Sequence, residues 1–167
     1  MVLIRELISR LNAAGVEYVI IGGVAARLHG SPMATEDLDI CCLMTEQNMA
    51  RLLDAIGPLN PIWFDPRRIP LPRDPSHLTK FRNMLLLTAA GRFDVLREVE
   101  PIGEFPAVFA ESEIFEVDGI PVRVLSIDAL MRVKSLTGRP KDKEGVMHLE
   151  AVKNRKLPRQ PPPPPSP

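Results

Sequence analysis

The sequence predicts one α/β (α+β) domain in which a mixed β-sheet is flanked by helices. Segments with the apolar spacing of helices alternate with short runs of β-branched residues, which are typical of strands. The composition, with 45% hydrophobic and 25% charged residues, is that of a soluble globular protein. A length of 167 residues suits one domain and is sufficient to bury a core.

The first third of the chain predicts helices and strands in alternation. The run "EYVIIGG" is rich in β-branched residues and closes on Gly22 and Gly23, which is typical of a buried strand. Thr45 is placed to cap the helix that follows the second strand. We expect a helix over 2–14, a strand over 17–23, a helix over 24–30, a strand over 37–44 and a helix over 45–56.

The rest of the chain begins with a proline-rich stretch, 58–82, which predicts a long loop. Trp63 and Phe64 lie in it and either anchor it to the core or stack on a base. We then expect two strands joined at Ala90-Gly91, a hairpin that turns at Asp118-Gly119, a helix over 126–138 and a helix after Pro140. The domain is predicted to cover 1–152, and 153–167 to form a proline-rich, disordered tail.

The charge balance excludes a basic surface spread over the whole chain, because 21 acidic residues offset 21 basic ones. Residues 132–156 still hold a local basic patch, which either grips a nucleic acid or forms a solvated helix face. Cys41 and Cys42 are adjacent on a predicted strand, so they point to opposite faces and are expected to be buried thiols of a reducing compartment. No run approaches the roughly 20 apolar residues of a membrane span. We expect a cytoplasmic protein without membrane contact.

Two carboxylates interrupt the second strand in "ATEDLDI". Asp37 and Asp39 lie two apart, so they project from one face, and like charges so close favour a divalent cation such as Mg²⁺ between them. Asp94 is a third carboxylate within an apolar strand pattern. Gly22 and Gly23 open a helix where backbone N–H groups are able to meet a phosphate. The alternative is that one aspartate caps a turn and the other is solvated.

The stretch from Ile21 to Ile40 resembles the signature of the nucleotidyltransferase superfamily, which has the DNA polymerase β-like fold. In that signature an apolar residue and two small residues precede a spacer, here 24–36, and then a carboxylate–apolar–carboxylate–apolar run. Asp94 resembles the third carboxylate of the superfamily. The later stretch "VLSIDALMRVKSLTGRPKD" is similar to small bacterial members, which include the AbiEii-type nucleotidyltransferase toxins and uncharacterised relatives. The resemblance covers roughly residues 1–152.

The resemblance implies a role for each motif residue. Asp37, Asp39 and Asp94 would be catalytic and would hold two Mg²⁺ ions, which bridge the triphosphate of a nucleotide such as ATP. Asp94 would also help to deprotonate the attacking hydroxyl. The other nucleotide-binding residues would be Gly22, Gly23, Thr35, Lys134, Arg139 and Lys141. For the three basic residues, the alternative is a favourable interaction with a helix dipole.

One position departs from the pattern of the small relatives. Met33 stands in "GSPMATEDLD" where they commonly carry an arginine that contacts phosphate or braces the loop. Arg27, Arg73 or Lys80 could take its place, and Thr35 is expected to hydrogen-bond within the loop and orient Asp37.

The sequence therefore predicts a Mg²⁺-dependent nucleotidyltransferase that moves a nucleoside monophosphate from a nucleoside triphosphate to a hydroxyl. The acceptor is an RNA, a protein or a small molecule, and a protein partner of a toxin–antitoxin type is possible. The alternative is a catalytically degenerate protein of the same fold that binds a nucleotide or a partner. Met33 favours that alternative, whereas three intact carboxylates favour the enzyme.

Overall fold

A seven-stranded mixed sheet forms the centre of the protein in a computed structural model that describes residues 2–156. The strand order is β3-β4-β5-β2-β1-β9-β8, and a separate two-stranded sheet joins β6 to β7. The strands are β1 (Tyr18–Ile21), β2 (Leu38–Cys42), β3 (Ile62–Trp63), β4 (Asn83–Thr88), β5 (Gly91–Leu96), β6 (Glu98–Val99), β7 (Gly103–Glu104), β8 (Ser112–Val117) and β9 (Ile120–Leu125).

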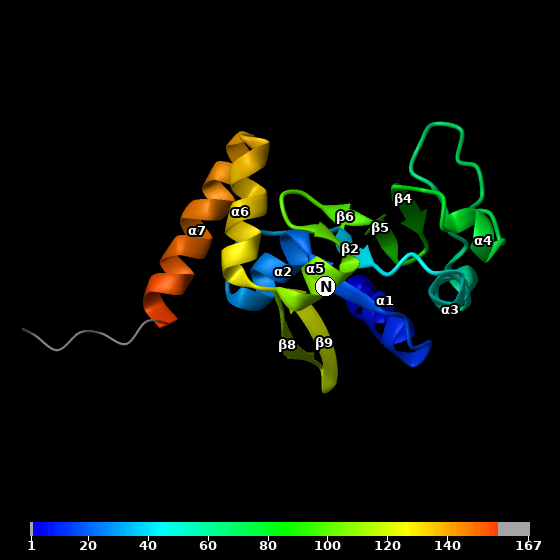
Figure 1. Cartoon of the computed structure of the whole chain (residues 1–167), viewed down its shortest axis with the longest axis horizontal. Coiled ribbons are helices and arrows are strands. Elements are labelled where there is room, and N and C mark those ends of the chain that lie inside the picture. The colour runs from blue at the N-terminus through cyan, green and yellow to red at the C-terminus, as the bar shows by residue number, and fades with distance from the viewer. Residues whose placement is uncertain (1, 157–167) are drawn as a thin grey trace, which may run out of the picture.

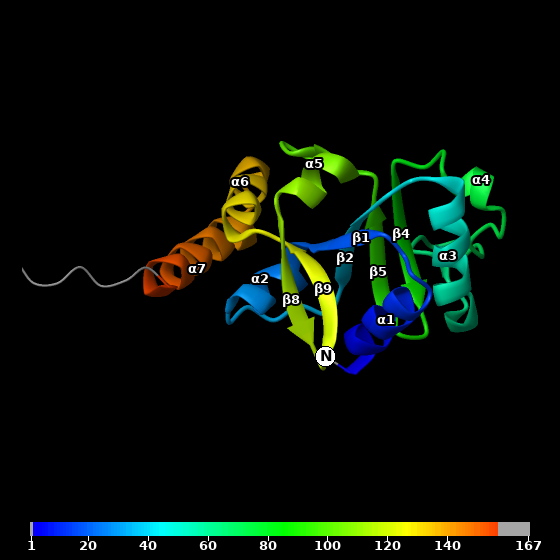
Figure 2. The same cartoon turned by 60° about the horizontal axis from the view of Figure 1, so that its bottom comes forward.

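Helices flank this sheet, as the sequence predicted. Figure 1 shows α6 and α7 side by side near α2 at one end of the molecule, and α3 with α4 at the other. Figure 2 shows α1 and α5 on opposite sides of the strands. The helices are α1 (Val2–Ala13), α2 (Gly22–His29), α3 (Glu46–Ile56), η1 (Gly57–Leu59), α4 (Pro75–Leu78), α5 (Phe105–Ala110), α6 (Ile127–Thr137) and α7 (Pro140–Lys156).

The central strands are the most deeply buried. All four residues of β1 are buried, and β1 lies antiparallel to β2 and parallel to β9. β2 also runs parallel to β5, so it is enclosed by strands on both edges. Cys41 and Cys42 are buried free thiols on β2, as predicted. The register between β2 and β5 determines which of their side chains lie next to each other.

Several predicted boundaries are confirmed by the cap geometry. The Thr45 side chain accepts a hydrogen bond from the Asn48 N–H at 3.3 Å at the start of α3. Gly30 ends α2 in the left-handed conformation with φ 113°. Asp118 and Gly119 both have positive φ and join β8 to β9 in the predicted hairpin.

Two sequence predictions of local structure were wrong. Residues 58–82 are not one loop: β3 pairs with β4, and Asp74 caps the short helix α4 through the Ser76 N–H. Gly22 and Gly23 begin α2 rather than end β1. No prediction covered β7 and α5, which are two and six residues long and too short for a periodic pattern. The helix predicted after Pro140 is α7, which runs to Lys156, and the predicted tail beyond it lies outside the described residues.

A membrane-spanning helix is not found in the part of the chain that the structure describes. Each helix there is too short or too polar to cross a bilayer.

Candidate active site

The three predicted carboxylates meet at the middle of the sheet. Asp39 on β2 is paired in register with Asp94 on the parallel strand β5, and Asp37 directly precedes β2. The Asp94 side chain is 9% exposed, whereas that of Asp37 is 41% exposed. The pairing of two distant strands therefore gathers side chains that lie far apart in the sequence.

The Gly22-Gly23 turn makes room for this cluster. Gly22 has a φ of +62°, and a Cβ added there would lie 2.9 Å from Cγ of Asp39 and overlap its Oδ2. A Cβ added to Gly23 would lie 2.5 Å from Oγ1 of Thr35. Real Cβ atoms do not approach side chains so closely, so both positions require glycine. The turn thus receives Asp39 and Thr35, a role that sequence analysis did not foresee.

Arg92 is the residue beside the carboxylates that sequence analysis did not single out. Its Nη2 lies 2.9 Å from Oδ2 of Asp94, and its Nε donates to Oδ1 of Asp94 at 3.3 Å. Its Nη1 lies 3.8 Å from Oδ2 of Asp37, so one guanidinium faces two of the three carboxylates. The signal was present: Arg92 lies two residues before Asp94 on one strand and therefore shares its face.

The pKa of Asp39 is raised by burial and by the negative charges around it. Burial raises this pKa from 3.8 to about 6, and the nearby charges of Asp94 and Asp37 add to the rise. The Gly23 backbone N–H and the Arg92 charge oppose it without cancelling it. The cluster as it stands is short of positive charge.

The donor set suits a divalent cation. Mg²⁺ prefers carboxylate oxygens, and Asp37, Asp39 and Asp94 present such oxygens around one point of the sheet. As they stand, no three His, Cys, Asp or Glu side chains within residues 2–156 are arranged to hold a metal ion. Arg92 supplies the positive charge instead, so its guanidinium stands in for a cation. The chemistry of the residues fits a metal, provided that Arg92 releases them.

A pocket of about 390 Å³ brings most of the predicted nucleotide-binding residues together. The glycine turn, Asp37 and Asp39 lie on one side of it, and α6 with the start of α7 forms another side. Of the predicted residues, its lining includes Gly22, Gly23, Thr35, Asp37, Asp39, Lys134, Arg139 and Lys141. Asp94 and its partner Arg92 are not among the lining residues. Glu98 and Glu100 also line the pocket, and sequence analysis did not single them out.

Asp142 organises the basic side of this pocket. It is buried and accepts hydrogen bonds from the Thr137 hydroxyl at 2.5 Å and from Nε of Arg139 at 2.8 Å. Nζ of Lys134 lies 3.5 Å from its other oxygen, and the Lys134 side chain packs across Gly145 of α7. Burial raises the pKa of Asp142, but the hydrogen bonds and positive charges of these partners together lower it by more. The pKa of Asp142 therefore lies below its ordinary value. Two of the three predicted basic residues are thus held by a carboxylate.

The loop between α2 and β2 carries Met33 and Thr35 into the pocket. The Thr35 hydroxyl donates to the backbone carbonyl of Asp37 at 3.4 Å, as expected from the sequence. The Ser31 hydroxyl accepts a bond from the Met33 N–H at 3.4 Å. The loop is thereby braced by hydroxyl groups in the absence of an arginine at position 33.

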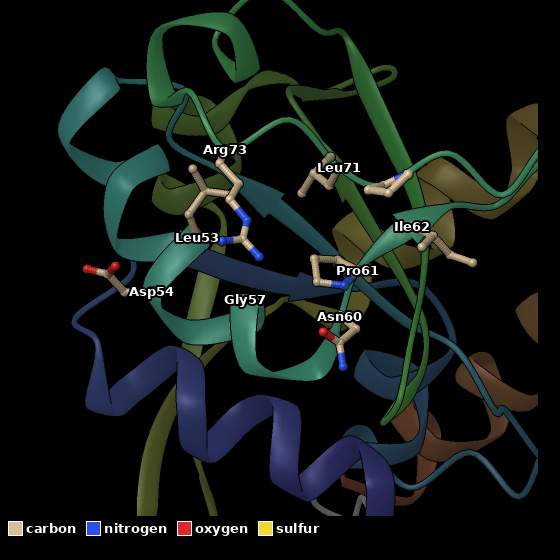
Figure 3. A pocket seen from close by; sticks show the side chains of 9 residues that line it. Leu53, Asp54, Gly57, Asn60, Pro61, Ile62, Leu71 and Arg73 are labelled. Atoms are coloured by element: carbon tan, nitrogen blue, oxygen red, sulfur yellow. The ribbon is translucent and has the colours of Figure 1, made fainter.

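Of the basic residues considered as replacements for that arginine, Arg73 lies elsewhere. It lines a separate pocket of about 510 Å³ between α3, η1 and the segment that follows β3. Figure 3 shows Arg73 near Leu53 in this second pocket, with Asp54 on the helix beside it. None of the predicted site residues lines this pocket. The arginine at the carboxylates is Arg92.

The neighbouring aromatic residues Trp63 and Phe64 have separate contacts. Trp63 is partly buried and meets Phe81 edge-on, with ring centroids 4.9 Å apart, so it anchors its segment to the core. Phe64 is 51% exposed, and Cζ of Arg92 lies 4.5 Å from its ring centroid. Phe64 therefore belongs to the surroundings of the carboxylates through Arg92.

Comparisons with solved structures reveal shared folds. The lincosamide antibiotic adenylyltransferase LnuA, solved with lincomycin, matches with a TM-score of 0.61 and 12% identity over 90% of this chain and 96% of that one. ANT(2″)-Ia in complex with adenylyl-2″-tobramycin matches with a TM-score of 0.55 and 15% identity over 92% of each chain. An antigenic nucleotidyltransferase-like protein from Paracoccidioides brasiliensis matches with a TM-score of 0.57 and 18% identity over 95% of this chain and 76% of that one.

The sequence itself gives no match. No family model matches it, and no curated protein is significantly similar to it. The structural likenesses, all below 20% identity, concern the arrangement of the chain. They show that this protein has the nucleotidyltransferase fold, as the sequence predicted.

Proposed function

We propose that this protein is a nucleotidyltransferase that moves a nucleoside monophosphate from a nucleoside triphosphate to a hydroxyl acceptor. One observation carries the proposal: Asp37, Asp39 and Asp94 converge beside the Gly22-Gly23 turn, at the rim of a pocket with a basic side. Carboxylates that hold divalent metal beside a phosphate site are what in-line nucleotidyl transfer requires. The shared fold with adenylyltransferases supports the same reaction.

In this proposal the carboxylates hold Mg²⁺. Asp37, directly before β2, and Asp39 on β2 would hold it together with Asp94 on β5, and the bound metal would supply charge stabilisation for the attacking and leaving oxygens. Asp94 helps to take the proton from the acceptor hydroxyl. A pKa of about 6 leaves Asp39 ionised at neutral pH, and a cation close to it lowers that pKa further.

The pocket walls bind the nucleotide. Backbone N–H groups of the Gly22-Gly23 turn, at the N-terminus of α2, face the phosphates. Lys134 and Arg139 offset phosphate charge while Asp142 holds them in place, and exposed Lys141 contributes a further positive charge. Thr35 keeps the loop that carries Asp37 in position.

ATP is the donor that the similar structures favour. One of them is an adenylyltransferase and another carries adenylyl-2″-tobramycin. Both concern antibiotics, which favours a small hydroxyl compound as the acceptor over an RNA or a protein. A closer relation to AbiEii-type enzymes, a toxin–antitoxin partner, a cytoplasmic location and a domain boundary near residue 152 stay predictions from the sequence.

A second candidate is a catalytically degenerate protein of this fold that binds a nucleotide or a partner. The ion pairs of Arg92 with Asp37 and Asp94 favour it, because they occupy oxygens that a metal needs. Met33 in the loop favours it as well. The two candidates differ in whether the carboxylates transfer a nucleotide.

A transfer assay separates them. The purified protein is incubated with Mg²⁺ and each nucleoside triphosphate labelled at the α-phosphate, with lincosamides, aminoglycosides, total RNA or lysate protein as acceptor. Asp37→Ala/Asp39→Ala is the test variant. Asp54→Ala is its control, since Asp54 is an exposed aspartate of α3.

Label on one acceptor class with the wild type and Asp54→Ala, but not with the double variant, supports the enzyme. A folded wild type that binds nucleotide and labels nothing supports the degenerate protein. Circular dichroism confirms that each variant is folded.

A further inference from the structure

We propose that Arg92 is an internal counter-cation of the carboxylate cluster: it pairs with Asp37 and Asp94 until a divalent cation displaces it, and it thereby sets the metal affinity of the site. The inference rests on the proposed function, since it takes the three carboxylates as the metal ligands. It assigns to Arg92 a positioning role.

The contacts of Arg92 show that it competes for the same oxygens as a metal would. Both oxygens of Asp94 are engaged, Oδ1 by Nε at 3.3 Å and Oδ2 by Nη2 at 2.9 Å. Oδ2 of Asp37 faces Nη1 at 3.8 Å. A cation that binds Asp94 and Asp37 together must take these oxygens from the guanidinium, because two cations at one point repel.

The charge of Arg92 does not disappear at any physiological pH. An arginine guanidinium stays protonated, and the hydrogen bonds that it donates to Asp94 raise the pKa of Arg92 above its ordinary value. The carboxylates are therefore freed only when the side chain moves away, not when it loses a proton. Release of the cluster is a movement driven by a competing cation.

The Phe64 ring can still contact the guanidinium after Arg92 leaves the carboxylates. Cζ of Arg92 lies 4.5 Å from the Phe64 ring centroid, a distance at which a cation is attracted to an aromatic face. The backbone of Phe64 is held beside β4, because its N–H donates to the Leu85 carbonyl at 2.8 Å. Arg92 thus lies between two partners, and it keeps one of them after the carboxylates turn to a metal.

A different reading of the same contacts makes the opposite prediction. If Arg92 only orients Asp94 for the metal, its removal weakens metal binding. If Arg92 is the counter-cation, its removal strengthens metal binding. In the wild type the apparent metal affinity is reduced, because only the fraction of molecules whose carboxylates are not paired with Arg92 is able to bind.

Mn²⁺ binding without nucleotide tests the inference directly. Free Mn²⁺ is measured by electron paramagnetic resonance during titration of the wild type, Arg92→Ala, Arg92→Lys and Arg123→Ala. Arg123 is a matched control, because it also lies on a strand and stacks on an aromatic ring, with its Cζ 3.9 Å from the Phe109 centroid. Asp37→Ala/Asp39→Ala shows which signal belongs to the carboxylates.

We expect Arg92→Ala to bind Mn²⁺ about tenfold more tightly than the wild type. Arg92→Lys keeps the charge and should fall in between, and Arg123→Ala should match the wild type. Arg92→Ala should also melt at a lower temperature in chelator and recover more than the wild type when Mn²⁺ is added. This second readout covers the case of a weakened fold.

Equal or weaker Mn²⁺ binding by Arg92→Ala overturns the inference while leaving the proposed function intact. Folded proteins that bind no Mn²⁺ at the carboxylates, with or without Arg92, overturn both. The two failures are therefore distinguishable.

Discussion

The Asp39 carboxylate lies so close to Gly22 that no side chain fits at position 22. The Gly22 backbone has a φ of +62°, and an added Cβ would overlap the Asp39 carboxylate. Asp39 is thereby seated against the first turn of α2, where the Gly23 N–H lowers its pKa against the effect of burial. The glycine turn and the carboxylates form one unit, which the following predictions test.

Gly22→Ala should destabilise the protein by about 2 kcal/mol or more, because strain at positive φ is added to a collision with Asp39. Gly138→Ala is the matched control: Gly138 also has a φ of +62° but no atom within 4 Å of its added Cβ. It should cost about 1–2 kcal/mol. Urea denaturation measures both, and equal losses would show that Asp39 yields without cost.

The pH dependence of stability should report Asp39. Its folded pKa of about 6 lies above the ordinary value of 3.8, so its stabilising share is present below pH 4 and is lost as pH rises through 6. In chelator, Asp39→Asn should therefore gain about 2 kcal/mol relative to the wild type between pH 4 and 7. Urea melts of both proteins across this range provide the measurement. A constant difference would mean that Asp39 is not buried among like charges.

Asp142→Asn should cost about 2 kcal/mol at pH 7, because Lys134 and Arg139 lose a buried partner. The folded pKa of Asp142 is lowered, so the cost should shrink as pH falls through that pKa. Asp128→Asn is the control. Asp128 also pairs with a lysine, Lys153, but its side chain is 58% exposed against 12% for Asp142.

The control should lose no more than about 1 kcal/mol. Thermal melts at pH 3 and 7 compare the two variants. A larger loss for Asp128→Asn would place the stabilising charge network elsewhere.

Lys141→Ala should weaken nucleotide binding about tenfold without changing stability, since Lys141 lines the pocket and is exposed. Lys143→Ala removes the same charge from the same helix, but Lys143 does not line the pocket. Titration with a fluorescent ATP analogue distinguishes the two. Similar losses in both variants would reduce the role of Lys141 to general electrostatics.

Sequence patterns predicted the parts of the fold that depend on local chemistry. Thr45, Gly30 and the Asp118-Gly119 turn act through their own backbone or side-chain bonds, so their residue types are informative on their own. β3 is different, because its two residues become a strand only through pairing with β4. Pairing of distant segments leaves little trace in a short stretch of sequence.

The same distinction applies to the site. Asp37 and Asp39 were predictable from a spacing of two on one strand, and Asp94 from a carboxylate in an apolar run. Arg92 was not predicted, because a charged residue near a turn is usually exposed to solvent. Its spacing from Asp94 nevertheless places both side chains on one face of β5. The link between Lys134 and Asp142 depends on how α6 packs against α7, which no pattern within either helix reveals.

The central claim is that the carboxylates transfer a nucleoside monophosphate. The most direct test compares ATP labelled at the α-phosphate with ATP labelled at the γ-phosphate, in parallel with Asp39→Asn. We predict that only the α-label reaches the acceptor, that the γ-label leaves as pyrophosphate, and that the variant transfers neither. Transfer of the γ-label, or unchanged α-transfer by a folded Asp39→Asn, would contradict the account.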